Sequence, residues 1–275
     1  MILRGFRAVP YVVLTGFALL YIYPMFWMIA NSFKDNEQIL VTNPFGFPAS
    51  LEWTNYINIM ESYRIDMFFL NSVIVAAVTV PLTAMLAGMF AFAVARMKWK
   101  WSGIAFTYIT MGLMIPVQVI LIPLVLLVRD LQLYNTHLGL ILPYTAFNLS
   151  FASMICYGFL RSVPKELEEA ACIDGANIYR IFGSVVFPVI RPAVATASIF
   201  VFLSAWNEFP LALVLTSKPT AQTLPLGVLS FVGQHTVDWG ALAAAMTIAS
   251  LPTLIIYLFF SEFVEKSLTV GSAVK

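Results

Sequence analysis

Residues 162–175 carry several charged side chains, and their residue types and spacing suggest a defined task. Its acidic side chains are Glu166, Glu168, Glu169 and Asp174. Carboxylates suit the positive end of a helix dipole, Pro164 is allowed in a first turn, and Ser162 can act as the cap. Gly175 can supply the left-handed residue that ends a helix. The pattern therefore predicts a short helix over about 164–174.

Helical spacing predicts that one face of this short helix carries four residues: Leu167, Ala170, Ala171 and Asp174. The two alanines leave a shallow surface that another protein can approach closely, and Glu166 and Glu169 beside it offer charge to a basic partner. We expect this helix to dock on a protein; a solvated loop or a membrane-surface helix is the alternative. A second short helix, about 177–187, is expected to follow and to stop at Pro188.

The other groups that could do chemistry are few. Cys156 and Cys172 form neither a disulfide framework nor a metal site, because the sequence has no second pair. His235 and Asp238 could indicate a metal or acid–base pair, but such a pair in a loop more often faces solvent. No Gly-Lys pair exists, so the chain has no P-loop to cradle a phosphate. We expect no cofactor in this chain.

One carboxylate lies inside an apolar stretch, in the sequence Trp206-Asn207-Glu208-Phe209-Pro210. An ionisable group at membrane depth is costly and usually faces a cavity or a partner helix. Trp206, Asn207 and Glu208 are therefore predicted to line a translocation pathway or a subunit interface. The alternative is that Glu208 snorkels to the outer headgroups.

The composition requires lipid as a solvent for the elements that carry these groups. The sequence is 60% hydrophobic and 11% charged, against about 45–50% and about 25% in soluble domains. A spanning helix needs about 20 mostly apolar residues. The sequence predicts an all-α integral membrane protein with six such helices, near residues 10–31, 69–95, 102–128, 138–160, 193–217 and 240–261.

Basic residues predict the orientation of these spans. If the N-terminus is inside, eleven of the 15 lysines and arginines are cytoplasmic, and only Lys34, Arg64, Arg129 and Lys218 are outside. This positive-inside bias places both termini in the cytoplasm. The inner residues are Arg4, Arg7, Arg96, Lys98, Lys100, Arg161, Lys165, Arg180, Arg191, Lys266 and Lys275.

Three connections are long enough to carry function: residues 32–68, 161–192 and 218–239. Prolines also occur inside the predicted spans. Membrane helices tolerate proline when neighbours satisfy the backbone, and the alternative is a kink that shapes a pathway. These prolines are Pro81, Pro116, Pro123, Pro143, Pro210 and Pro252.

The acidic loop resembles a known signature. Glu169-Ala170-Ala171, three residues, Gly175, nine residues and Val185-x-Phe187-Pro188 are similar to the EAA motif of ABC-importer permeases, E-A-A-x3-G-x9-I-x-L-P. The match departs only at Val185 and Phe187, which are apolar replacements. Further segments resemble the sugar-importer branch, of maltose and oligosaccharide type: Asn31-Ser32-Phe33-Lys34, Asn55-Tyr56, Asn71-Ser72, Ala91-Phe92-Ala93 with Arg96, Pro116, Trp206-Asn207 and residues 268–275.

The resemblance implies a type I importer permease in a prokaryotic inner membrane. It implies three kinds of partner: a second homologous permease, two ATP-binding subunits that hold ATP and magnesium, and an extracytoplasmic sugar-binding protein. The EAA helix would sit in a cleft of the ATPase, with Leu167, Glu169, Ala170, Ala171, Asp174, Gly175 and Pro188 as coupling residues. Residues 1–68 would form the first helix and outer loop, 69–261 the permease core and 262–275 a cytoplasmic tail.

Two other classes of function are disfavoured by the residues themselves. An ion-driven transporter or channel would need several intramembrane ionisable groups in a relay, and only Glu208 qualifies. A membrane-embedded enzyme would need a nucleophile–base or metal constellation at membrane depth, and the sequence has none.

The predicted topology can be tested by cysteine accessibility. Cys156 and Cys172 are first replaced by alanine, and single cysteines are then introduced. Cysteines within 40–50 or 220–235 should react with impermeant reagents in intact cells, whereas those within 165–180 should not. Labelling of 165–180 from outside would contradict the N-inside arrangement of six helices.

Overall fold

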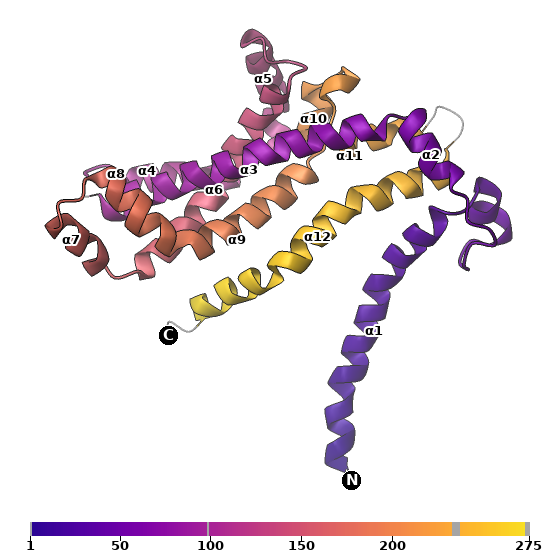
Figure 1. Ribbon diagram of the computed structural model, residues 1–275, viewed down its shortest axis with the longest axis horizontal. Coiled ribbons are helices and arrows are strands. Elements are labelled where there is room, and N and C mark those ends of the chain that lie inside the picture. Colours follow the sequence, from indigo (N-terminus) through magenta and orange to yellow (C-terminus); the bar gives the residue numbers. More distant parts are fainter. Residues whose placement is uncertain (1, 98, 233–236, 273–275) are drawn as a thin grey trace. The chain divides into compact units, whose positions relative to one another are not determined.

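The computed structural model describes residues 2–97, 99–232 and 237–272 (Figure 1). His235 lies outside these stretches, whereas the Asp238 side chain accepts a hydrogen bond from Ala241 N at the start of α12. The described residues are helical and include no strand. The chain divides into two compact units, Met1–Asp66 with Gly227–Pro252 (unit 1) and Met67–Leu226 with Thr253–Lys275 (unit 2).

Unit 1 contains one long apolar helix and a folded outer segment. Its helical elements are α1 (Ile2–Asn31), a π-helical turn (Gln38–Thr42), α2 (Thr54–Glu61), a 3-10 turn (Val228–Phe231) and the first part of α12 (Trp239–Ser272). Helix α1 exposes apolar side chains along its described length, as a helix does whose solvent is lipid or a neighbouring helix.

The predicted outer loop 32–68 is compact at its start. The Lys34 side chain is fully buried, and its Nζ donates to the Asn43 carbonyl oxygen at 2.8 Å; burial lowers the pKa of this amine. Asn55 Nδ2 donates to the carbonyl oxygens of Ser32 and Lys34. A Cβ atom at Gly240 would lie 2.5 Å from the Lys34 carbonyl oxygen. Only glycine therefore lets α12 begin this close to the turn.

Unit 2 is a bundle whose longest helices are α3 (Ile65–Arg96), α6 (His137–Ser162) and α9 (Phe187–Trp206). Its shorter elements are α4 (Ser102–Met111), a 3-10 turn (Gly112–Met114), α5 (Val117–Asp130), α7 (Glu166–Ile173), α8 (Ile178–Arg180), a π-helical turn (Ile181–Val186), α10 (Pro210–Leu215), a 3-10 turn (Pro219–Ala221) and α11 (Leu224–Gly227). In Figure 1, α7 and α8 lie at one end of this unit, far from α10.

Small side chains let these long helices approach closely. Helices α6 and α9 lie side by side, and Ala84, Ala87 and Ala91 of α3 share a buried cluster with Ala152 of α6 and Ala197 of α9. In membranes, where lipid is as apolar as leucine, such packing replaces the hydrophobic effect as the source of association. These alanines therefore serve packing.

Five of the six predicted spans correspond to helices long and apolar enough to cross a membrane. The predicted span 102–128 is bent, because α4 with its 3-10 turn and α5 meet at an angle of 104°. Ile115 is extended (φ −86°, ψ 113°) because it precedes Pro116, whose ring disfavours a helical residue before it. Counted as one bent span, this pair completes the six.

The predicted span 193–217 also differs from the structure. The helical segment begins at Ile178 and ends at Trp206, and α10 begins after a break at residues 207–209. Pro210 occupies the first position of α10, where its missing N–H costs nothing. Pro116 and Pro210 thus mark breaks, whereas the other predicted span prolines lie inside helices: Pro81, Pro123, Pro143 and Pro252.

Candidate functional site

Helix α7 confirms the short helix predicted in the acidic loop, although it begins at Glu166 rather than at Pro164. Val163 is extended (ψ 132°), as a residue before proline prefers, and this ends α6. The Ser162 hydroxyl donates to the Phe159 carbonyl oxygen at 2.7 Å. The predicted cap at Ser162 is therefore wrong, because this side chain completes the last turn of α6 instead.

The C-terminus of α7 is a Schellman turn. Gly175 N donates to the Cys172 carbonyl oxygen and Ala176 N to the Ala171 carbonyl oxygen, both at 3.0 Å. Gly175 has a φ of +76°, which confirms the predicted left-handed residue. A Cβ atom at this position would meet no atom within 4 Å, so the requirement for glycine comes from the backbone alone.

Helix α7 has a face turned to the bundle and a face left open. Glu168 and Ala171 are half-buried, and Ala171 packs with Ala176 against the buried cluster of α3, α6 and α9. The predicted face is therefore wrong at Ala171, which the bundle covers. The open face is apolar as well as acidic, with Leu167 47% and Ile173 86% exposed. The exposed residues that the sequence predicted as coupling residues are Leu167, Glu169, Ala170, Asp174 and Gly175.

The second short helix was predicted to stop at Pro188, and this prediction is wrong. Helix α8 continues through the π-helical turn Ile181–Val186 into α9, where Pro188 lies in the first turn. In a π turn the backbone N–H groups bond to carbonyls five residues back instead of four. The helix continues through Pro188, although proline has no N–H to donate. Phe182 of this turn packs against Phe92 of α3, with ring centroids 5.5 Å apart.

Arg96 is the residue of this region whose role the sequence did not predict. It ends α3, and its Nη2 donates to the carbonyl oxygens of Leu160 at 2.8 Å and Val163 at 2.7 Å. Its Nε lies 2.8 Å from Oε1 of Glu168. The sequence had marked Arg96 only as an inner basic residue and as part of the segment Ala91-Phe92-Ala93 with Arg96 that resembles the sugar-importer branch.

Trp206, Asn207 and Glu208, the residues predicted to line a pathway, lie in different environments. Trp206 is buried against Phe69 and Phe202, with centroids 5.5 Å away in each case. Asn207 is exposed, and its amide donates to the Leu203 carbonyl oxygen at 2.8 Å. The adjacent break in the helix therefore places a buried aromatic ring and an exposed amide next to the intramembrane carboxylate.

Glu208 acts as the cap of α10. Its Oε1 accepts from Leu211 N at 2.7 Å, and its Oε2 accepts from Ala212 N at 3.0 Å. The Tyr144 hydroxyl of α6 donates to Oε2 at 2.7 Å. A carboxylate at a helix N-terminus satisfies N–H groups that lipid cannot. The chain therefore supplies three donors to this carboxylate, which needs no headgroup partner.

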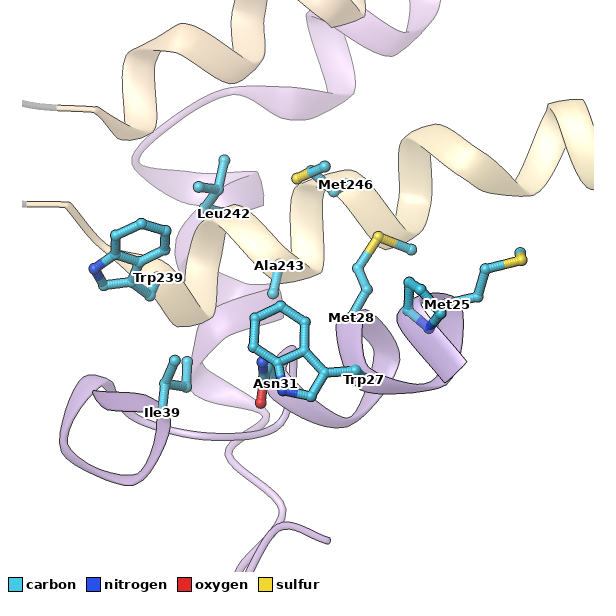
Figure 2. A pocket seen from close by; sticks show the side chains of 10 residues that line it. Met25, Trp27, Met28, Asn31, Ile39, Trp239, Leu242, Ala243 and Met246 are labelled. Carbon is cyan, nitrogen blue, oxygen red and sulfur yellow. The ribbon is translucent and has the colours of Figure 1, made fainter. Parts of the chain in front are cut away.

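An apolar groove of about 360 Å³ lies in unit 1, between the end of α1 and the first turns of α12. Figure 2 shows Trp27 and Met28 of α1 facing Ala243 and Met246 of α12, with Asn31 between Trp27 and Ile39. Asn31 is the one polar residue of the lining. The groove therefore suits acyl chains or apolar side chains rather than a sugar.

Residues 82–270 match the family described as "Binding-protein-dependent transport system inner membrane component". The chain belongs to this family. It is thus a multi-pass membrane permease subunit of an ABC transporter and not an enzyme, which agrees with the missing P-loop.

Two curated relatives are similar over nearly their whole length. The "Diacetylchitobiose uptake system permease protein NgcG" of Streptomyces coelicolor is 34% identical, covering 98% of this chain and 89% of that protein. The "Trehalose/maltose transport system permease protein MalG" of Thermococcus litoralis is 30% identical, covering 93% and 92%.

Two solved structures share the fold. A chain of a bacterial ABC transporter involved in the import of the acidic polysaccharide alginate superposes with a TM-score of 0.82 at 21% identity, covering 94% of this chain and 96% of that one. A second structure shows a bacterial alginate ABC transporter in complex with an alginate pentasaccharide-bound periplasmic protein. Its chain gives a TM-score of 0.67 at 15% identity, covering 94% and 93%. The permease architecture predicted from the sequence is thereby confirmed.

Replacing Glu208 tests the cap. Glu208→Leu should leave the first N–H groups of α10 without acceptors, at a cost of about 1–3 kcal/mol. We expect normal membrane insertion with a lower melting temperature and impaired transport or assembly. Glu208→Gln keeps an acceptor and should lose less, and Tyr144→Phe, which removes one of three donors, is the matched control. Wild-type stability and uptake in Glu208→Leu would contradict this role.

Proposed function

We propose that this permease forms half of the translocation pathway for a sugar or oligosaccharide, in an importer driven by ATP. The support comes from relatives whose names refer to diacetylchitobiose, trehalose and maltose, and from a fold shared with an importer of alginate. A pathway for such cargo needs polar groups, and Asn207 is an exposed amide at the break before α10.

The other half of the pathway is a second homologous permease, and a binding protein delivers the substrate. The family description names binding-protein dependence, and a related transporter has been captured with a substrate-bound periplasmic protein. Two ATP-binding subunits supply the energy, with ATP and magnesium bound to them. This chain has no Gly-Lys pair with which to bind a phosphate.

Helix α7 is the contact through which this chain responds to the ATPase. The observation that carries the proposal is its open face, where Leu167 and Ile173 are exposed beside the small residue Ala170. Exposed apolar side chains among exposed acids on a short helix favour a protein partner. The Schellman turn at Gly175 holds the angle between this helix and α8, so the face is presented in one direction.

A contact between α7 and the ATPase also sets the orientation of the chain in the membrane. If α7 contacts a cytoplasmic ATPase, residues 161–192 are cytoplasmic, and the basic bias then places both termini inside. Asn207 and Glu208, at the opposite end of α9 from α7, line the pathway or the interface with the second permease, and Trp206, predicted with them, is buried within the chain beside this break. Residues 1–68, 69–261 and 262–275 then form the first helix with its outer segment, the core and the tail.

Two substitutions on α7 test the contact. Ala170→Trp adds bulk to the open face, where overpacking costs about 1–3 kcal/mol. Gly175→Val places a β-branched residue at a φ of +76°, which only glycine and asparagine accept readily. Both variants should insert normally, yet lose the ATPase subunits in copurification or lose ATP hydrolysis linked to uptake.

Conservative replacements at the same positions serve as controls. Ala170→Ser keeps the face shallow, and Gly175→Asn tolerates the left-handed backbone, so both should retain ATPase association and uptake. Wild-type association together with wild-type sugar uptake in Ala170→Trp or Gly175→Val would show that α7 does not have this role.

A further inference from the structure

We propose that Arg96 is a positioning residue that ties the coupling helix α7 to the transmembrane helices α3 and α6. The proposal rests on the coupling role proposed for α7, and it concerns how motion of the spans reaches that helix. The juxtaposition that carries it is one guanidinium in contact with the ends of three helices.

The first part of the argument is the place of the guanidinium between α3 and α6. Arg96 is the last residue of α3, and its side chain is 5% exposed. The Nη2 group donates to the carbonyl oxygens of Leu160 and Val163, which lie in the last turn and at the C-terminal cap of α6. The Leu160 carbonyl also accepts from Val163 N at 3.1 Å, and both carbonyls lie at the negative end of the helix dipole. One cation thus joins the ends of two spans.

The second part is the contact with α7. Arg96 Nε lies 2.8 Å from Glu168 Oε1, and the Glu168 side chain is 15% exposed. The two groups form an ion pair across this distance. Charges this far removed from water persist because each compensates the other. Glu166 and Glu169, in the same turn, are exposed instead. Glu168 is therefore the acid of that turn that faces the bundle.

The third part is how the inner face of α7 is held. The segment packs against the π-helical turn Ile181–Val186, and Ala171 and Ala176 are half-buried against the cluster of α3, α6 and α9. Glu168 adds the charged contact of this face. Because the same guanidinium bonds the end of α6 and belongs to α3, a displacement of either span reaches α7 through it.

The test separates this role from folding. Glu168→Gln removes the charge facing Arg96 and leaves the bonds to Leu160 and Val163 in place. The complete transporter, with its ATPase subunits and binding protein, is reconstituted in liposomes. Uptake of the substrate held by the binding protein and ATP hydrolysis are measured together on the same vesicles, alongside melting temperature. Arg161→Ala is the matched control, because Arg161 is exposed and lies over the Tyr157 ring.

We expect Glu168→Gln to keep its ATPase subunits and its melting temperature, while substrate uptake per ATP falls about fivefold to tenfold. Arg96→Gln should lower the same ratio, and the double variant Arg96→Gln/Glu168→Gln should be no worse than Arg96→Gln, because the two residues act as a pair. Arg161→Ala should keep the wild-type ratio.

A wild-type ratio of uptake to ATP in Glu168→Gln would overturn the proposal. So would a loss of uptake that only follows a loss of folded complex, because Arg96 would then serve stability alone. If the wild-type chain itself holds no ATPase subunit, the proposed function fails; if it does and Glu168→Gln couples normally, only the present inference fails.

Discussion

A backbone that crosses lipid must satisfy its polar groups within the protein, and the rest of this structure depends on that constraint. Helices meet it by their own hydrogen bonds, except at the ends and where a proline such as Pro81 or Pro143 removes a donor. Where a helix breaks, side chains must form hydrogen bonds with the backbone groups that have lost their helical partners. Glu208 accepts from Leu211 N and Ala212 N at the start of α10. This carboxylate is thus placed where backbone groups lose their helical partners.

The same rule operates at the α7 end of the bundle. Arg96 donates to the carbonyl oxygens that end α6, as Glu208 accepts from the amides that start α10. The two sites differ in what they hold in addition. Glu208 binds the Tyr144 hydroxyl of a neighbouring helix, whereas Arg96 faces Glu168 of α7. A group recruited for backbone satisfaction can therefore also join one element to the next.

Helix α7 is attached to the bundle by one face and leaves its other face exposed. Ala171 lets it lie close to the bundle, and Gly175 turns the chain sharply enough to return to α8. The outer face then keeps Leu167 and Ile173 exposed, at a cost that a partner protein would recover on binding. An exposed apolar helix of two turns is unsuited to a free loop and well suited to a contact surface.

Much of this protein follows from the sequence. Apolar runs of about 20 residues can only be spanning helices, and Gly175 with the acids before it already encodes the short helix and its left-handed end. The EAA spacing led directly to the family. These features are local, because each depends on residues within a few helical turns of one another.

Other features depend on contacts between residues distant in the chain, and only the tertiary structure decided them. Pro116 and Pro123 are both prolines within one apolar run, yet the helix breaks at the first and continues through the second. Arg96 and Glu168 are paired across the ends of three helices. Ala171 and Ala170 are identical in type, and burial separates them. Sequence spacing cannot specify such choices, because they depend on which neighbouring helix supplies a surface, an acceptor or an opposite charge.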